Sequence, residues 1–248
     1  MTAPAITATA VPRFDRHEGA ALQRVEYRRM ARQLRGLDAA AWSAPTDCPE
    51  WTVRDMAAHV LGGLEGNASP REGAHQMWVA WRSDRTFVDG LGVVQIRDRA
   101  GVAPVEILRR FEAVIDRAVR ARERMPAALR ALPLRFTAPS GVERMRLRDL
   151  LDTVYLRDAW MHRVDIARAA GTSLELTADH DGRIVADVVG EWARRHGQPF
   201  RLDLDGPAGG RFAEGDGGED VHLDAVEFCR IVSGRAPGPG LLTQEVVF

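Results

Sequence analysis

The chain has 248 residues, 45% of them hydrophobic, so it is long enough to bury one large or two modest cores. Its formal net charge of −1 argues against nucleic acid or an acidic membrane surface as a partner. All 34 basic side chains are arginine, and the lack of lysine excludes Schiff-base and lysine-base chemistry. Residues 1–14 lack the features of a signal peptide, and no apolar run is long enough to span a membrane. We therefore expect a cytoplasmic protein whose residues 1–14 form a disordered tail.

Four amphipathic helices are predicted in the first two-thirds of the chain. They cover about residues 15–36, a segment that begins near Thr52, residues 103–124 and residues 146–171. Between the second and the third we expect a short helix near 75–81, followed by a loop. Four such helices with long connections are typical of a bundle with at least one crossover, in which inward-facing side chains build cofactor sites.

The second helix carries a histidine next to a group of glycines. Thr52 and Asp55 have the spacing of a capping box, so the helix should begin there. By its angular position, His59 lies on the shoulder of the apolar face, in a sector that it shares with small residues. These residues indicate a helix that ends early, a close approach of another backbone, or an open cleft. They are Gly62, Gly63 and Gly66.

The fourth helix carries Asp158 and His162, four residues apart on its apolar stripe. A carboxylate and an imidazole one turn apart point the same way, so they can hold one metal ion or simply bond to each other in the core. Asp165 either accepts a hydrogen bond from His162 or pairs with a nearby arginine. With His59, the pair completes a set of three ligands, which leaves a catalytic zinc-type site open to water or substrate.

Two segments of the chain resemble a known family. EWTVRDMAAHV and RDAWMHRVDI are similar to the two signature stretches of the mycothiol-dependent maleylpyruvate isomerases, a branch of the DinB-like metal-binding four-helix bundles. The resemblance implies that His59 and His162 are metal ligands and that Asp158 stands at the position of a family glutamate. Aspartate is one methylene shorter, so its carboxylate reaches a metal only if the helix approaches more closely or a water bridges.

After Gly171 the pattern changes to that of a small α+β unit. A helix at about 178–196 precedes three short alternating stretches, a further helix and the closing segment LLTQEVVF. This part resembles the sterol-carrier-like C-terminal domain of many family members, including a helix followed by Gly234 and Arg235. We therefore expect a mainly α, two-domain protein, with a helical bundle over residues 15–172 and an α+β domain over 173–248.

Arg235 matches an arginine that the family places near its active site. A guanidinium group suits a bidentate clamp on a substrate or cofactor carboxylate, and the alternative is a surface arginine at a helix end. The two cysteines, Cys48 and Cys229, are too few for a disulfide scaffold and are expected to be separate thiols. Cys48 precedes a helix start, where a reactive thiol is one interpretation and a small apolar loop residue is the other.

The resemblance implies thiol chemistry at a divalent metal, most plausibly zinc. The expected enzyme takes mycothiol as a small thiol cosubstrate, adds it to an electrophilic small molecule, and completes either an isomerisation or an S-transfer. Two alternatives stay open. One is a non-catalytic module that binds a small molecule or a partner and has a degraded metal site. The aspartate at position 158 supports this alternative. The other is metal-assisted hydrolysis, for which the sequence offers no obvious general base.

Overall fold

The computed structural model describes residues 4–138 and 141–248, which form two compact units. The first unit is helical and runs from Asp15 to Ser173. The second combines the N-terminal segment with Leu174–Phe248 and contains both helices and strands. This mainly α, two-unit architecture is the predicted fold class. Each helix that the structure describes is too short or too polar to cross a lipid bilayer.

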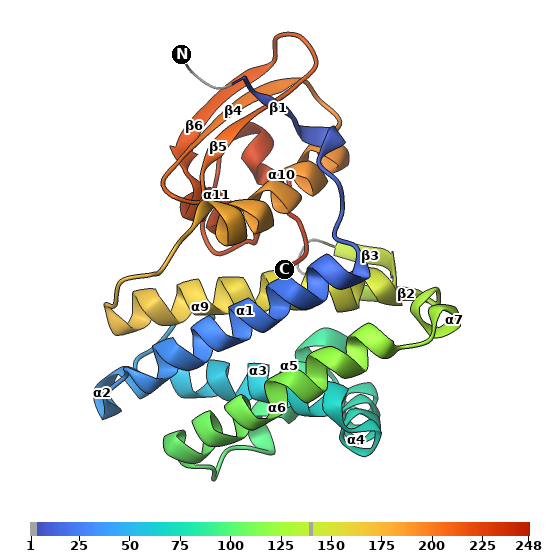
Figure 1. Ribbon diagram of the computed structural model, residues 1–248, viewed down its shortest axis with the longest axis vertical. Helices are drawn as coiled ribbons and strands as arrows, with labels where there is room; N and C mark the ends of the chain where they lie inside the picture. Colours follow the sequence, from blue (N-terminus) through green and yellow to red (C-terminus); the bar gives the residue numbers. More distant parts are fainter. Residues whose placement is uncertain (1–3, 139–140) are drawn as a thin grey trace. The chain divides into compact units, whose positions relative to one another are not determined.

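Four long helices build the bundle of the first unit. They are α1 (Arg16–Arg35), α3 (Val53–Ala68), α6 (Pro104–Arg124) and α9 (Tyr155–Ala170). Both α1 and α3 pack against α6 and against α9, so the four helices enclose one core (Figure 1). Apolar residues at helical spacing fill that core, and Met30, Leu61 and Phe111 are almost fully buried in it. The four predicted helices are therefore confirmed.

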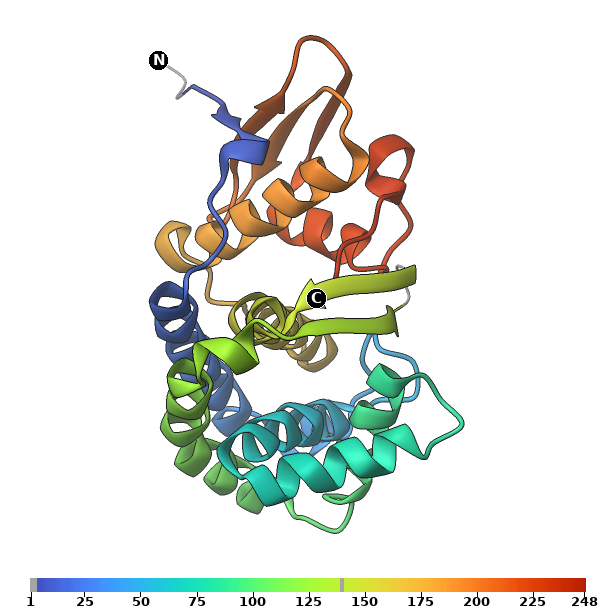
Figure 2. The ribbon, with the colours of Figure 1, turned by 90° about the vertical axis from the view of Figure 1, so that its right-hand side faces the viewer.

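Shorter elements connect the bundle helices. They are α2 (Ala39–Trp42), α4 (Pro70–Trp81), α5 (Phe87–Arg97), α7 (Ala127–Arg130), β2 (Pro133–Ala138), β3 (Gly141–Arg146) and α8 (Leu147–Asp149). Strands β2 and β3 form an antiparallel hairpin, yellow-green in Figure 2. The expected loop after residue 81 was wrong over α5, because this helix contains two glycines and shows little apolar periodicity in the sequence.

The glycines of α3 allow a second layer of helices to approach closely. The helix continues through them to Ala68, so the early end was not the correct interpretation. A Cβ atom on Gly62 would lie 2.6 Å from the side chain of Gln95 on α5, and one on Gly66 would lie 3.0 Å from Gln76 on α4. A larger residue at Gly62 would clash with Gln95 close to the backbone of α5, whereas one at Gly66 would have to displace the end of the Gln76 side chain.

A π-helical turn, Leu150–Val154, leads directly into α9. Such turns carry one extra residue and are frequent next to functional sites. The turn packs on α1 at Gly19, where a Cβ atom would lie 2.9 Å from the carbonyl oxygen of Asp152. This contact holds the start of α9, which carries Asp158 one turn later, against the bundle.

The second unit is a four-stranded sheet covered by two helices. The strand order is β1 (Ile6–Thr7), β5 (Gly210–Glu214), β4 (Phe200–Asp205) and β6 (Glu219–Asp224). Helices α10 (Arg183–His196) and α11 (Ala225–Val232) pack against it. Alternate residues of β4 are buried, and Trp192 of α10 meets Phe200 and Phe228 edge to face at centroid distances of 4.8 and 5.4 Å.

The expected disorder of residues 1–14 was wrong for residues 4–14. In this segment β1 pairs in parallel with β5, placing Ile6 opposite Phe212, and a short 3₁₀ helix follows (Ala8–Ala10). Ala8 is fully buried, and its carbonyl oxygen lies against Gly190 of α10. A two-residue strand is too short to show an alternating pattern, and its pairing partner lies some 200 residues away. Neither the strand nor its pairing can therefore be recognised from the local sequence.

Candidate functional site

The packing of α3 against α9 brings His59, Asp158 and His162 together. His59 Nε2 lies 3.7 Å from Asp158 Oδ2, and His162 Nε2 lies 3.1 Å from Asp158 Oδ1. Ligand-type atoms of the three side chains all lie within 4.8 Å of one another. The capping box of Thr52 and Asp55, now seen in full, fixes the first turn of α3 and with it the position of His59.

The charges in this cluster stabilise one another against burial. Burial alone would raise the pKa of Asp158, but the two imidazoles, above all His162, hold that pKa well below its usual value. Burial would also lower the pKa of His162, yet the charge of Asp158 and the hydrogen bonds of its neighbours raise it well above the usual value. The buried carboxylate of Asp158 is therefore stable only beside a positive charge, which protonated histidine or a metal ion can supply.

The spacing of the three side chains also suits a metal ion. Ligands about 2.0–2.2 Å from a tetrahedral zinc lie about 3.3–3.6 Å from each other. The separations of 3.1 and 3.7 Å bracket this range, and the donor set of two nitrogens and one carboxylate is that of catalytic zinc sites. Asp158 is 29% exposed and His162 only 5%, so solvent or a ligand reaches the cluster beside Asp158.

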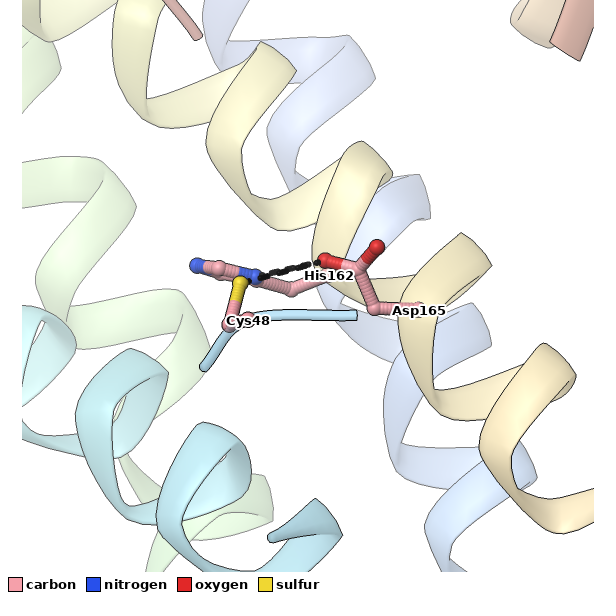
Figure 3. Close-up of side chains that lie close together, drawn as sticks. All are labelled: Cys48, His162 and Asp165. Atoms are coloured by element: carbon pink, nitrogen blue, oxygen red, sulfur yellow. Dashed lines mark hydrogen bonds and ion pairs between the residues drawn. The ribbon is translucent and has the colours of Figure 1, made fainter. Parts of the chain in front are cut away.

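A second carboxylate lies on the other side of the His162 ring. Asp165 is fully buried, and its Oδ2 lies 3.2 Å from His162 Nδ1 (Figure 3). With Nδ1–H donating to Asp165, the lone pair of Nε2 points toward Asp158 and His59. A carboxylate in this position fixes both the tautomer and the ring orientation of a metal-binding histidine. Of the two interpretations of Asp165, the hydrogen bond to His162 is therefore present.

Trp51 forms an aromatic wall beside both imidazoles. Its ring centroid lies 5.0 Å from that of His59 and 6.0 Å from that of His162. Gly92 of α5 lies against both rings, because a Cβ atom there would come within 3.2 Å of the Trp51 indole and 3.8 Å of His59 Nδ1. His59 Nδ1 is buried in this corner without a hydrogen-bond partner. The wall therefore leaves Nε2 as the nitrogen with which His59 can bind a cation.

Comparison with known proteins places these residues in a family. The family model of the mycothiol maleylpyruvate isomerase N-terminal domain matches residues 24–167. The chain belongs to this family. No curated protein sequence matches it at a significant level. Two solved structures, a mycothiol-dependent maleylpyruvate isomerase and a mutant of that enzyme, are similar to it with 18% identity and a TM-score of 0.58. Each alignment covers 93% of this chain and 92% of the other, and at this identity it shows a common fold.

The segment matched by the isomerase family includes His59, Asp158 and His162 but ends before the α+β unit. Arg235 lies outside it, after the C-cap Ser233 and Gly234 that end α11. The backbone N–H of Arg235 donates to the carbonyl of Arg230 at 2.9 Å, and Gly234 adopts a φ of 78°. This is the hydrogen bond of a Schellman helix end, which fixes the backbone of Arg235. Its side chain is partly buried.

The sequence did not reveal that Trp51 and Cys48 lie beside the two histidines. Trp51 directly precedes the capping residue of α3, which was the one signal that it would lie near His59. Cys48 lies in the loop before α3, and its Sγ is 3.8 Å from Asp165 Oδ2, beside the His162 ring (Figure 3). No local pattern connects a loop cysteine with a helix more than 100 residues later, so this contact becomes visible only in the fold.

Proposed function

We propose that this protein is a metal-dependent enzyme that uses a low-molecular-weight thiol, mycothiol, to act on a small electrophilic substrate. His59, Asp158 and His162 are the proposed ligands, and zinc is the proposed metal. The observation that carries the proposal is the convergence of the three donors within 4.8 Å in a chain of the mycothiol maleylpyruvate isomerase family. The exposed edge at Asp158 leaves room for a further ligand.

The chain's own residues have distinct proposed roles. His59 and His162 bind through Nε2, Asp158 supplies the negative charge, and Asp165 holds the His162 ring by its hydrogen bond. When bound, a divalent cation favours the thiolate form of a coordinated thiol at neutral pH. The chemistry that such a thiolate would supply is addition to an electrophilic, unsaturated acid, which would end in either isomerisation or S-transfer.

Asp158 fits the role of a direct ligand in spite of its short side chain. Its two oxygens each face one imidazole, at 3.1 and 3.7 Å, without an extra methylene. This supports a metal site that has adapted to aspartate over one that has degraded. The Asp158→Glu variant tests the point, because a longer acid should keep or tighten binding if the carboxylate coordinates directly.

We propose Arg235, in the α+β unit, as the clamp for a carboxylate of the substrate or thiol cofactor. The α+β unit itself is proposed to correspond to the sterol-carrier-like domain of the family. A guanidinium group binds carboxylates by paired hydrogen bonds and contributes nothing to coordination. Arg235→Ala should therefore impair turnover and leave the metal content unchanged. Arg201→Ala is the matched control, because Arg201 is an exposed arginine of the same unit.

The decisive experiment is a thiol-dependence assay on metal-loaded protein. Consumption of an electrophilic unsaturated acid should require mycothiol and should disappear in His162→Ala. Full metal content without any thiol-dependent turnover over a panel of such acids would contradict the enzymatic proposal and favour a binding module. Turnover without thiol would favour hydrolysis by metal-bound water.

A further inference from the structure

A second set of metal-ligating atoms lies on the opposite side of the His162 ring. It consists of Cys48, His162 and Asp165, whose ligand-type atoms lie within 4.8 Å of one another (Figure 3). Cys48 comes from the loop before α3, and the other two come from adjacent turns of α9. His162 is the one residue that belongs to both sets, with Nε2 facing the first and Nδ1 facing the second.

Two of the three separations in this second set are close to those of a tetrahedral site. Sγ of Cys48 lies 3.8 Å from Asp165 Oδ2, and Nδ1 of His162 lies 3.2 Å from the same oxygen. Around a zinc-sized ion, a sulfur at about 2.3 Å and an oxygen or nitrogen at about 2.0–2.2 Å lie about 3.5 Å apart. The third pair, Sγ of Cys48 and Nδ1 of His162, also lies within 4.8 Å, so the three donors are close enough together to share one ion.

Each nitrogen of His162 has its own carboxylate. Asp158 Oδ1 lies 3.1 Å from Nε2, and Asp165 Oδ2 lies 3.2 Å from Nδ1. Either neutral tautomer is therefore satisfied, because the N–H that does not face a metal always finds an acceptor. A neutral imidazole has one lone pair, so it binds one ion at a time. The two sets must compete for His162.

The loop that carries Cys48 is held in place by its own hydrogen bonds. Thr46 Oγ1 accepts from the Cys48 N–H at 3.2 Å and donates to the Trp51 carbonyl at 2.9 Å. The N–H of Trp51 donates to the Cys48 carbonyl at 3.1 Å. Cys48 itself is partly exposed, whereas Asp165 is fully buried. The thiol is therefore positioned in advance, and an ion can reach it from solvent.

We propose that Cys48, His162 through Nδ1, and Asp165 form a second cation site that takes a thiophilic divalent ion such as Cd²⁺ and withdraws His162 from the first set. Thiolate selects soft ions, whereas the first set offers only nitrogen and oxygen. On binding, a cadmium–sulfur bond replaces the S–H bond of Cys48, whose proton is released to solvent. The proton on Nδ1 is also released to solvent, and Nε2 keeps its own proton, which it donates to Asp158. The site does not require the chain to be an enzyme.

Cadmium titration of the metal-free full chain tests this site. The ultraviolet charge-transfer absorption of a cadmium–thiolate bond should rise to one equivalent in the wild type. Cys48→Ser should abolish this absorption and weaken cadmium binding about 100-fold. Cys229→Ser is the matched control, since Cys229 is the other cysteine and lies in α11 of the α+β unit. Absorption that survives in Cys48→Ser and disappears in Cys229→Ser would overturn the proposal.

Two further arms separate this site from the proposed function. His59→Ala removes a ligand of the first set alone, so it should lose zinc and keep the cadmium–thiolate absorption. Cadmium added to zinc-loaded wild type should release the zinc, as measured with a chromogenic zinc indicator, and should release less from Cys48→Ser. Cadmium–thiolate absorption with zinc fully retained would contradict the competition for His162. Failure of wild type to bind zinc, with cadmium bound by Cys48, would count against the proposed function alone.

Discussion

Partly buried carboxylates lie near both ends of α3, but the side chains that neutralise them differ. Toward its C-terminal end, Glu65 accepts hydrogen bonds from Arg99 and from Arg110 Nε at 2.9 Å, and Arg99 also reaches Glu72 at 3.0 Å. Toward the N-terminal end, His59 and its neighbour His162 face Asp158. Among the residues that the structure describes, no arginine lies within ion-pair distance of Asp158.

This difference separates a structural cluster from a candidate site. An arginine is always charged and fills its donor positions with carboxylates, so the Glu65 end is complete as it stands. A histidine changes its charge near neutral pH and offers a lone pair when it is neutral. The His59 end can therefore exchange protons for a metal ion. Substitutions at the Glu65 end should therefore lower stability without changing metal binding, whereas substitutions at the His59 end should weaken metal binding.

The largest effect is expected from His162→Ala. The binding free energy of zinc at structural sites with four ligands is about 10–16 kcal/mol. One ligand therefore contributes roughly 3–4 kcal/mol, which is about 10²–10³-fold in affinity. Equilibrium dialysis against a competing chelator would measure this loss. His75→Ala is the control, because His75 also pairs with a carboxylate, Asp98 at 2.7 Å, on the surface of the same unit. Equal affinity in the two variants would remove His162 from the ligand set.

Arg99→Met tests the other end of α3. Arg99 is almost fully buried, and its loss leaves Glu65 and Glu72 with fewer partners in a partly dry environment. Since both acids keep some exposure, we expect a loss of about 2–3 kcal/mol in the free energy of unfolding, with unchanged zinc content. Urea unfolding measures it, and Arg109→Met, in an exposed pair with Glu106, should change the free energy of unfolding far less. A loss of zinc in Arg99→Met would show that the two ends are coupled.

Asp165→Asn should have a smaller effect on the metal. The asparagine oxygen still accepts a hydrogen bond from Nδ1–H, but the charge that strengthens His162 as a ligand is gone. Loss of such a carboxylate weakens metal binding about 10–100-fold, and we expect the lower end of that range. Zinc affinity measured beside that of Asp158→Asn checks the order, because the proposed direct ligand should lose more. The reverse order would make Asp165 the more important acid.

The weakest effect concerns the pH dependence of the metal-free protein. Because the pKa of Asp158 is lowered, its stabilising contribution is complete above the ordinary aspartate pKa and is lost as pH falls through the lowered value. Because the pKa of His162 is raised, its contribution is complete below the ordinary histidine pKa and is lost as pH rises through the raised value. The free-energy difference between wild type and Asp158→Asn should therefore be greatest at roughly pH 4–6.5. A difference that grows steadily above pH 8 would contradict this pairing.

The bundle helices could be predicted from the sequence because each buries one face at a spacing of three and four residues. Helix α5 could not, because its Gly90 and Gly92 serve close packing against Ser83 and Trp51 and break the apolar pattern. The spacing of the fourth helix put Asp158 and His162 on one face, and the family motif added His59. The contacts of Cys48 and Trp51 depend on how a loop folds back on α9, which no periodicity encodes.

X-ray absorption spectroscopy of zinc-loaded protein would show whether two imidazoles and one carboxylate form the metal site. We expect about one zinc per chain, with only nitrogen and oxygen ligands at about 2.0–2.2 Å and the outer scattering of two imidazole rings. The scattering of one ring should disappear in His59→Ala if any zinc remains. A sulfur ligand at about 2.3 Å in the wild type would place zinc at Cys48 and contradict the claim, as would protein that retains no zinc at all.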